Sequence, residues 1–368
     1  MIRTTHRLNF QSAASMDSIE DESADLVVTS PPYPMIEMWD GVFSSQADAA
    51  GAALAAGDGP AAFEEMHRLL DRVWEECYRV LKPGAFACIN IGDATRKIGD
   101  NFRLYSNHSR ITSFCTALGF QALPAVIWRK QTNGPNKFMG SGMLPSGAYV
   151  TLEHEYILIF RKGGKRVFSG ADKTRRRESA FFWEERNRWF SDLWDFKGVR
   201  QRIHPQEFGS SPGGIRDRSA AFPFELAYRL ICMYSLKGDT VLDPFLGTGT
   251  TMAAAVTAAR NSCGVEIDSG FAESIFSQLQ EGVPEMNRRI RERVTDHLSF
   301  IREYRDSKGK EPAHTNDYYG FPVITRQEKE LRLPLVESIE SIDEAAELVT
   351  ARHRETPEIV TEGLPLFE

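Results

Sequence analysis

A strand, a glycine turn and a helix follow one another in residues 240–260, and this unit constrains the fold more than any other feature of the sequence. The strand is short and apolar and ends at Asp243. Gly247 and Gly249 then remove side chains where a ligand would approach the backbone, and the helix start that follows favours a negatively charged group. The sequence therefore predicts a ligand-binding loop at the carboxyl end of a buried strand.

The same alternation of strands and helices runs through most of the chain. Apolar runs predict further strands at 25–30, 85–91, 125–129, 155–160 and 264–268. Apolar residues at helical spacing predict helices at 63–81, 107–118 and 222–236. This order indicates an α/β fold with a mainly parallel sheet covered on both faces. The Ala- and Gly-rich stretch at about 41–62 is interpreted as a mobile surface insertion.

The glycine turn lacks the features of two common nucleotide sites. No Gly-Lys-Ser/Thr is present, so no lysine is placed for a β-phosphate, and Met252 stands where a dinucleotide-binding turn has its third glycine. An acidic residue, Glu266, lies in the next predicted strand, where a carboxylate can accept hydrogen bonds from both hydroxyls of a ribose. This combination favours ligand binding over a plain connection between a strand and a helix.

A second loop with chemical character follows the strand at 25–30 and contains Ser30, Pro31, Pro32 and Tyr33. Two prolines stiffen the backbone and remove two N–H donors, while Ser30 adds an oxygen acceptor and Tyr33 a flat ring. A rigid slot of acceptors beside a stacking wall matches a planar group with an amino donor, such as an extruded base. The alternative is a plain loop with a buried tyrosine.

One segment is strongly basic although the whole chain is acidic. The formal net charge is −7, yet residues 161–218 hold 15 Lys/Arg and 8 Asp/Glu, which leaves −14 for the rest. The segment includes the triplet Arg175, Arg176 and Arg177 and six aromatic residues between 181 and 194. Such a segment indicates a local nucleic-acid interface or, alternatively, a solvated face.

Cysteine spacing and hydropathy argue against other classes. The five cysteines form no CxxC pair and no Cys/His cluster, so we expect no disulfide framework and no metal site. Residues 1–25 lack the apolar stretch of a secretory signal, and no run reaches the roughly 18 apolar residues of a membrane span. A cytoplasmic protein without a membrane partner is expected.

The two loops resemble motifs of a known family, the amino-group-specific DNA methyltransferases that use S-adenosylmethionine. Residues 25–33 (DLVVTSPPY) are similar to the family's catalytic motif, and residues 243–251 (DPFLGTGTT) to its cofactor motif. The segments VLKPG, VIWRK and EHEYILIFRK resemble supporting motifs. Because the catalytic motif comes first, the order is that of the beta group. The resemblance implies a circularly permuted, Rossmann-like class I methyltransferase fold with a mixed, mainly parallel sheet of seven strands.

The resemblance also implies roles for individual residues. Catalysis falls to the loop from Ser30 to Tyr33. Cofactor contacts fall to Asp243, Pro244, Phe245, Gly247, Thr248, Gly249, Thr250, Glu266, Phe222 and Pro223. Lys130 and the triplet Arg175, Arg176 and Arg177 are the expected DNA contacts. The chain departs from the family at 218–221, where His-Pro-Ala is usual, and at 9–12, where Gly-Asp is usual, so no residue is assigned to the cofactor adenine.

Four regions are expected along the chain. Residues 1–162 form the first part of the catalytic core, and residues 163–217 form an inserted target-recognition region that binds DNA. Residues 218–280 form the cofactor-binding part of the core. Residues 281–368 form a helical C-terminal extension and an acidic tail.

The expected reaction is direct methyl transfer to an exocyclic amine. Its lone pair is delocalised into the ring, and acceptors at Ser30 and Pro31 would localise it. Serine before Pro-Pro-Tyr favours cytosine N4, with adenine N6 as the alternative. A non-catalytic DNA-binding module and an RNA or protein methyltransferase are further readings. The expected partners are S-adenosylmethionine and double-stranded DNA, with a homodimer and a cognate restriction endonuclease of the same restriction–modification system as further candidates.

Overall fold

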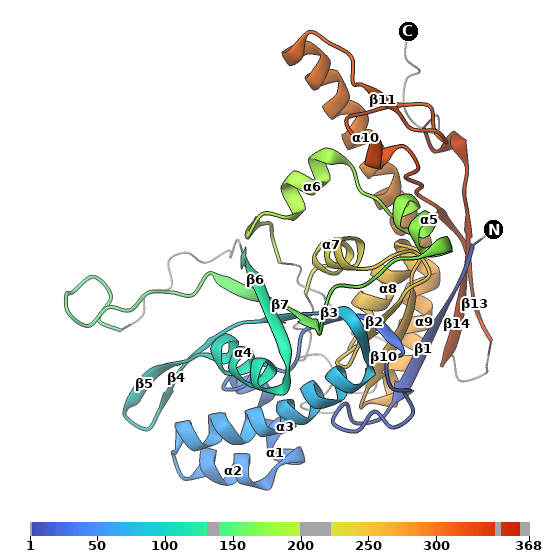
Figure 1. The fold of residues 1–368 in the computed structure, drawn as a ribbon. Helices are drawn as coiled ribbons and strands as arrows, with labels where there is room; N and C mark the ends of the chain where they lie inside the picture. The colour runs from blue at the N-terminus through green and yellow to red at the C-terminus, as the bar shows by residue number, and fades with distance from the viewer. Residues whose placement is uncertain (1, 131–139, 199–221, 343–346, 361–368) are drawn as a thin grey trace.

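The computed structural model describes residues 2–130, 140–198, 222–342 and 347–360, and these residues are organised around one ten-stranded sheet (Figure 1). The strand order is β13-β14-β1-β10-β9-β2-β3-β7-β6-β8. In that order the bounds are Leu335–Ser341, Leu348–Arg354, Ile2–Phe10, Asn261–Glu266, Thr240–Asp243, Ala24–Thr29, Leu81–Ile91, His154–Lys162, Phe120–Arg129 and Leu193–Asp195.

The expected mixed, mainly parallel sheet is confirmed. Five adjacent strands, β1, β10, β9, β2 and β3, run parallel, whereas β7 is antiparallel to both of its neighbours. These five strands with β7 and β6 make seven. Three further strands were not expected: β8 extends one edge, and β14 and β13 extend the other.

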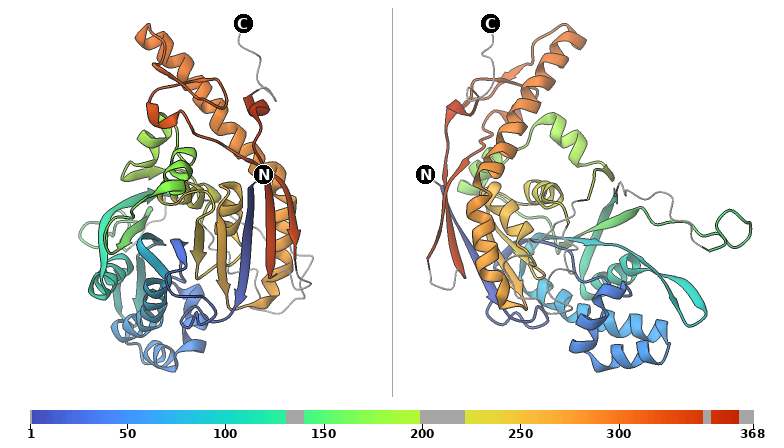
Figure 2. Two further views of the ribbon diagram at one scale, coloured as in Figure 1. Left: turned by 45° about the vertical axis from the view of Figure 1, so that its right-hand side comes forward. Right: turned by 180° about the vertical axis from the view of Figure 1, so that it is seen from behind.

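Strand β2 shows why both faces of the sheet are covered. All six of its residues are buried, because Val27 packs into the core on one face and Leu26 and Val28 into the core on the other. The first face carries α1 (Asp40–Gln46), α2 (Asp48–Ala55), α3 (Gly59–Val80) and α4 (Asn107–Leu118). The second carries α7 (Phe224–Tyr234), α8 (Thr250–Thr257), α9 (Ala272–Glu281) and α10 (Val283–Lys308) (Figure 2).

The insertion at about 41–62 is helical and packed, which corrects the expectation of a mobile surface segment. Helices α1 and α2 contact α3, and their residues Phe43 and Ala50 are buried. Asp58 then caps α3 by accepting a hydrogen bond from the amide of Ala61 at 3.0 Å. Alanines at helical spacing supply the contact surface, although they lack the large apolar side chains that signal a buried helix.

In the described part of the C-terminal extension, the one α-helix is α10, at its start. After α10 the chain forms the short pair β11 (His314–Thr315) and β12 (Pro322–Val323), and then β13 and β14. Strand β14 pairs with β1, and its residues Val349 and Ala351 are buried. The exposed charged residues of these two strands are Glu337 and Glu340 in β13, and Arg352 and Arg354 in β14, so this pair of strands is balanced in charge and completes the sheet.

The basic segment is described as far as residue 198. It forms α5 (Gly170–Glu178), α6 (Trp183–Trp189) and β8, which joins the sheet beside β6. The remainder of the expected target-recognition region lies outside the described residues, so the region boundaries stay predictions. A hairpin, β4 (Ala94–Ile98) and β5 (Asn101–Tyr105), follows β3. Within the described ranges, no helix has the length and apolar character needed to cross a membrane.

Candidate active site at the carboxyl edge of the sheet

The cofactor loop and the catalytic loop lie side by side because β9 and β2 are parallel neighbours. Each loop starts where its strand ends, at Asp243 and at Thr29. The carboxyl ends of parallel strands face one edge of a sheet, which is where open α/β sheets bind ligands. The two loops are more than 200 residues apart in the sequence, and the fold brings them together.

Asp243 links the two loops directly. Its Oδ1 accepts hydrogen bonds from the Thr29 hydroxyl at 2.6 Å and the Phe245 amide at 3.0 Å, and its Oδ2 accepts one from the Thr251 hydroxyl at 2.6 Å. Burial raises the pKa of Asp243 to about 6. The structure thus places Asp243 beneath the cofactor loop, where it fixes the catalytic strand relative to the first turn of α8.

The two glycines give the cofactor loop its shape. Gly247 and Gly249 have φ values of 53° and 85°, a region that other residues rarely adopt. A Cβ on Gly249 would lie 3.0 Å from the Ile275 side chain, so bulk is excluded here as well. Gly249 is the residue before α8, and the buried Thr250 Oγ1 has no hydrogen-bond partner among the described residues.

Glu266 stands beside this loop at the end of β10. Its Oε2 accepts a hydrogen bond from the Gly247 amide at 2.9 Å, and its Oε1 accepts from the amides of Ile267 and Asp268 at 2.9 and 3.1 Å. Oε2, which accepts only one hydrogen bond, keeps acceptor capacity for a ribose hydroxyl. The neighbouring Ile267 side chain is 59% exposed and offers an apolar surface at the same edge, which sequence reasoning missed.

Phe222 and Pro223 lie beside the cofactor loop, because both line the same cavity of about 260 Å³. Both are buried, and they line it together with Thr248, Gly249 and Thr250. The expected proximity of this pair to the glycine turn is therefore present. Of the other expected contacts, Pro244 and Phe245 belong to the same turn, and the Phe245 ring packs edge-on against Trp74.

The catalytic loop is held by a hydrogen-bond network. Ser30 donates to the Tyr33 hydroxyl at 3.2 Å, and that hydroxyl donates to Glu155 Oε2 at 2.9 Å. Asn90 Nδ2 donates to the Tyr33 hydroxyl at 2.8 Å and to Glu155 Oε2 at 2.7 Å. Lys130 forms an ion pair with Glu155 Oε1. Four strand ends, those of β2, β3, β6 and β7, thus meet around one phenol.

Two members of this network, Asn90 and Glu155, were not expected as site residues. Asn90 is a polar residue inside an apolar strand, and Glu155 begins one, so both carried a signal in the sequence. Burial, followed by the Glu155 carboxylate, raises the pKa of Tyr33 well above its ordinary value. The phenol therefore stays protonated and acts as a donor.

The expected DNA contacts separate into two places. Lys130 lies in the network around Tyr33, but the triplet in α5 lies at the opposite edge, near the start of β9. Arg175 pairs with Asp172 at 2.7 Å and approaches Asp239 at 3.5 Å, and Arg177 pairs with Glu330 at 2.8 Å. Arg176 lies over the Phe168 ring, with its guanidinium carbon 4.5 Å from the centroid. The structure does not bring the triplet to the catalytic loop.

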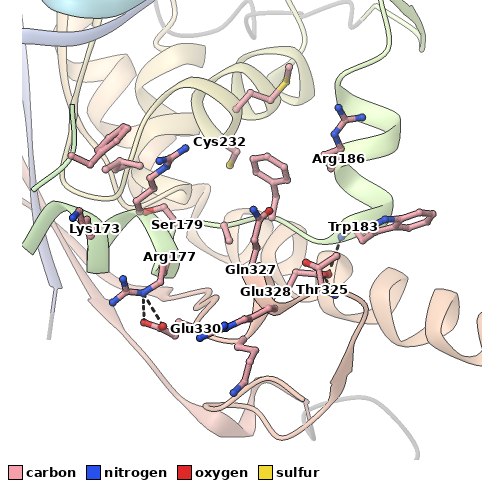
Figure 3. A pocket seen from close by; sticks show the side chains of 18 of the residues that line it. Lys173, Arg177, Ser179, Trp183, Arg186, Cys232, Thr325, Gln327, Glu328 and Glu330 are labelled. Atoms are coloured by element: carbon pink, nitrogen blue, oxygen red, sulfur yellow. Dashed lines mark hydrogen bonds and ion pairs between the residues drawn. The ribbon is translucent and has the colours of Figure 1, made fainter. Parts of the chain in front are cut away.

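Arg176 and Arg177 of the triplet border a wide groove of about 1610 Å³ between α5, α6, the end of α7 and residues 317–330. Figure 3 shows Lys173, Arg177 and Arg186 around it, with Arg177 directed at Glu330. Its cations are Lys173, Arg176, Arg177, Arg186, Arg326 and Lys329, against Asp317, Glu328 and Glu330. The groove is basic and partly aromatic, with Phe181, Trp183 and Phe190 in its wall.

Comparisons with known proteins agree with this geometry. The DNA methylase family model for N6- and N4-type enzymes matches residues 24–277. The Type II methyltransferase M.MthZI of Methanothermobacter thermautotrophicus is 52% identical over 335 residues, which cover 90% of this chain and 91% of that protein. M.MjaI of Methanocaldococcus jannaschii is 51% identical over 289 residues, covering 76% of this chain and 92% of that protein.

A solved structure gives the same result for the fold and the cofactor. TTHA0409 of Thermus thermophilus, in complex with S-adenosyl-L-methionine, aligns with a TM-score of 0.56 and 32% identity over 76% of this chain and 96% of that one. The glycine turn, the orphaned Thr250 hydroxyl and the Glu266 carboxylate fit such a ligand. The chain belongs to the DNA methylase family of amino-group methyltransferases, and its cofactor is S-adenosyl-L-methionine.

Proposed function

We propose that this protein methylates the N4 amino group of cytosine in duplex DNA, with the target base turned out of the helix into the slot beside Ser30. The observation that carries the proposal is the linked pair of loops, in which Thr29, Asp243 and Thr251 hold the catalytic loop against the cofactor loop. Serine before Pro-Pro-Tyr favours cytosine over adenine.

The residues of the slot act on the amine before and during transfer. The Ser30 hydroxyl donates its hydrogen bond to Tyr33, and Asn90 Nδ2 approaches Ser30 Oγ at 3.5 Å, so one lone pair of this oxygen is left to accept from the substrate amine. The Pro31 carbonyl is a second acceptor on a backbone that two prolines stiffen. Acceptors fixed in advance stabilise the positive charge that grows on the nitrogen, and the cofactor supplies the methyl group.

Tyr33 provides the wall against which the base stacks. Its hydroxyl is fixed by Asn90 and Glu155, and a Cβ on Gly92 would lie 3.0 Å from its ring. The ring is thus held at both its edge and its face, so the slot is formed before the base arrives. Positioning of both reactants in this way contributes much of the rate of a direct displacement.

Further DNA contacts are proposed for Lys130, which lies at the slot and would have to give up Glu155, and for the basic groove. Among the described residues, Arg176 and Arg186 have aromatic rings but no carboxylate within ion-pair distance, which leaves their charge for phosphate. Arg175 and Arg177 would first have to give up Asp172 and Glu330. We therefore assign the phosphate contacts of the triplet mainly to Arg176.

The proposed biological role is the modification half of a restriction–modification system, since the two relatives above are named Type II methyltransferases. A cognate endonuclease would recognise the same DNA sequence. DNA methylated by this protein should then resist that endonuclease.

The deciding experiment is methylation of plasmid DNA with labelled S-adenosyl-L-methionine, digestion to nucleosides and mass spectrometry. We expect N4-methylcytosine, and sequencing of the modified DNA then gives the recognition site. Detection of N6-methyladenine would show that the target is the N6 amino group of adenine, and the protein would still be a DNA amino-group methyltransferase. Cofactor binding without any modified nucleoside would favour a non-catalytic DNA-binding module.

A further inference from the structure

The segment 140–150, here called the arm, projects from the molecule beside the β4–β5 hairpin (Figure 1). Its tip exposes two adjacent apolar side chains, Met143 at 87% and Leu144 at 70%. Val150, nearer the core, is 85% exposed. Adjacent apolar side chains that are this exposed are unfavourable in water and indicate a surface that another molecule covers.

The tip of the arm is a folded loop, and the hydrogen bonds of this loop hold Met143 and Leu144 in their exposed positions. Gly140 and Ala148 form a β-bridge, and Ser141 N donates to the Gly147 carbonyl at 2.9 Å. Ser141 also donates its hydroxyl proton to the Leu144 carbonyl. These bonds close a tight loop that directs no polar side chain over Met143 or Leu144.

On its C-terminal side the arm leads into the wall of the catalytic slot. Three residues beyond it, the Glu153 carbonyl accepts a hydrogen bond from Lys130 N at 2.8 Å, between the end of β6 and the start of β7. The Lys130 side chain pairs with Glu155, and Glu155 accepts from Tyr33. The arm therefore grows from the residues that position the proposed base-binding ring.

A second support holds the arm toward the hairpin. Tyr149 stacks on Phe102 of β5, with ring centroids 4.7 Å apart. The hairpin in turn is tied to α1 by two hydrogen bonds of 2.8 and 2.7 Å between Arg96 and Asp40. Arg103 of the hairpin lies over the Tyr105 ring and has no carboxylate within ion-pair distance among the described residues, so its charge is available for a phosphate beside the arm. Lys97 pairs with Asp100, and Arg129 lies near Glu153 and Asp195.

We propose that Met143 and Leu144 enter the base stack of the duplex at the position that the target base leaves. This inference rests on the proposed function, because only an extruded base leaves such a gap. Extrusion costs the stacking of that base, and apolar side chains that intercalate between base steps offset part of this cost. The arm carries these side chains and lies between β6 and β7, whose ends form part of the proposed base-binding slot.

The test uses the full chain with Met143→Ser and Leu144→Ser combined, which removes the apolar surface and keeps the backbone bonds of the loop. Val167→Ser is the matched control, because Val167 is also 87% exposed and follows β7 at the opposite edge of the sheet. Single-turnover methylation is measured on a duplex with the recognition site found above, and on the same duplex with a mismatch opposite the target base. A fluorescent analogue at the target position reports extrusion.

We expect the double variant to be about tenfold slower on the matched duplex and within about threefold of the wild type on the mismatched one, since a mismatched base costs less to extrude. Fluorescence on binding should fall with the matched duplex only. Equal losses on both duplexes, or none on either, would overturn the role of the tip. If the wild-type protein methylates neither duplex, the proposed function itself fails, and that outcome is seen before any variant is made.

Discussion

Asp239 immediately precedes the four-residue strand β9 and Asp243 ends it, and the partners of the two carboxylates differ. Asp239, at the amino end, binds the Arg166 guanidinium through two bonds of 2.5 and 3.1 Å. Asp243, at the carboxyl end, accepts hydrogen bonds from two threonine hydroxyls and one amide, with no cation among these partners. Both side chains are 2% exposed, so burial alone does not separate them.

The difference shows how one sheet separates stability from function. At the amino edge, carboxylates and cations neutralise each other: Asp25 pairs with Lys82 at 2.8 Å, and Asp239 with Arg166. At the carboxyl edge, neutral donors hold Asp243, and acceptor capacity remains at Ser30 and Glu266. We infer that ion pairs at the amino edge stabilise the fold, whereas the carboxyl edge keeps groups available for ligands.

The largest expected effect tests the carboxyl edge. Ser30→Ala removes one acceptor for the amine and should lower the single-turnover methylation rate by about 1000-fold, since removal of one group that stabilises transition-state charge costs about 10²- to 10³-fold. Calorimetry should show S-adenosyl-L-methionine affinity within about twofold of the wild type. Ser109→Ala, on α4, is the control. Loss of cofactor binding in Ser30→Ala would show that Ser30 belongs to the cofactor site instead.

The next effect tests the amino edge. Asp239→Asn removes the closest carboxylate of Arg166 but leaves Asp25 at 3.5 Å, so it should lower the free energy of unfolding by about 3 kcal/mol in urea titrations. The methylation rate per folded molecule should not change, because the cluster lies away from the catalytic loop. Asp192→Asn at an exposed site should change stability by less than about 0.5 kcal/mol. A lowered methylation rate in folded Asp239→Asn would contradict the inference that the amino edge contributes to stability and not to catalysis.

A pH series on Asp243 sharpens the comparison further. Its pKa is raised from 3.8 to about 6, so between these values the folded protein holds a proton that the unfolded chain has released. Stability from this residue therefore falls as pH rises through that window, by about 3 kcal/mol in total. Asp243→Asn should remove this loss of stability. Unfolding titrations of the wild type and the variant at pH 4.5, 5.5 and 7 would show it, because the difference between their free energies of unfolding should change with pH.

Glu76 gives the opposite sign and serves as the control. Its pKa is lowered, mainly by the hydrogen bonds from Arg79, so its contribution is present at neutral pH and is lost as pH falls below its ordinary value of 4.5. Glu76→Gln should therefore matter most at neutral pH. A pH-independent effect of Asp243→Asn would mean that the carboxyl group titrates normally in the fold.

The smallest effect distinguishes members of the arginine triplet. Arg176→Gln should reduce the slope of log affinity against log salt by about 0.9, the value for one lost phosphate contact. Arg175→Gln should leave the slope unchanged and lower stability, because Arg175 belongs to the cluster around Asp239. DNA binding is measured between about 50 and 200 mM salt. An equal change of slope in both variants would show that Arg175 also contacts a DNA phosphate.

The sequence predicted the centre of the fold because local patterns encode it. The run at 25–30, the turn at 243–251 and Glu266 each carry their signal within a few residues, and the parallel order of strands follows from their alternation with helices. The catalytic network was only half predicted. Ser30 and Tyr33 stand in a motif, but Asn90 and Glu155 act through contacts made between distant strands.

Charge composition alone did not predict where two segments lie in the fold. The triplet at 175–177 is as basic as a DNA contact would be, yet the end of β7 delivers α5 to the amino edge, next to Asp239. The acidic C-terminal part suggested a peripheral tail, although apolar residues of β13 and β14, among them Ile339 and Val349, pack into the core and add two strands to the sheet. Neither placement can be read from charge, because each depends on which sheet edge the chain reaches.

The pairing of β1 with β10 and β14 has a consequence for synthesis in the cell. Residues 2–10 leave the ribosome long before residues 261–266 and 348–354, which provide both of its neighbours. At roughly 5–20 residues per second, both edges of this strand stay bare for about 13 to 50 seconds, and the edge that pairs with β14 stays bare for about 17 to 70 seconds. Nascent chains of this enzyme should therefore be prone to mispairing until translation is nearly complete, and chaperone occupancy of the first strand is expected to end only then.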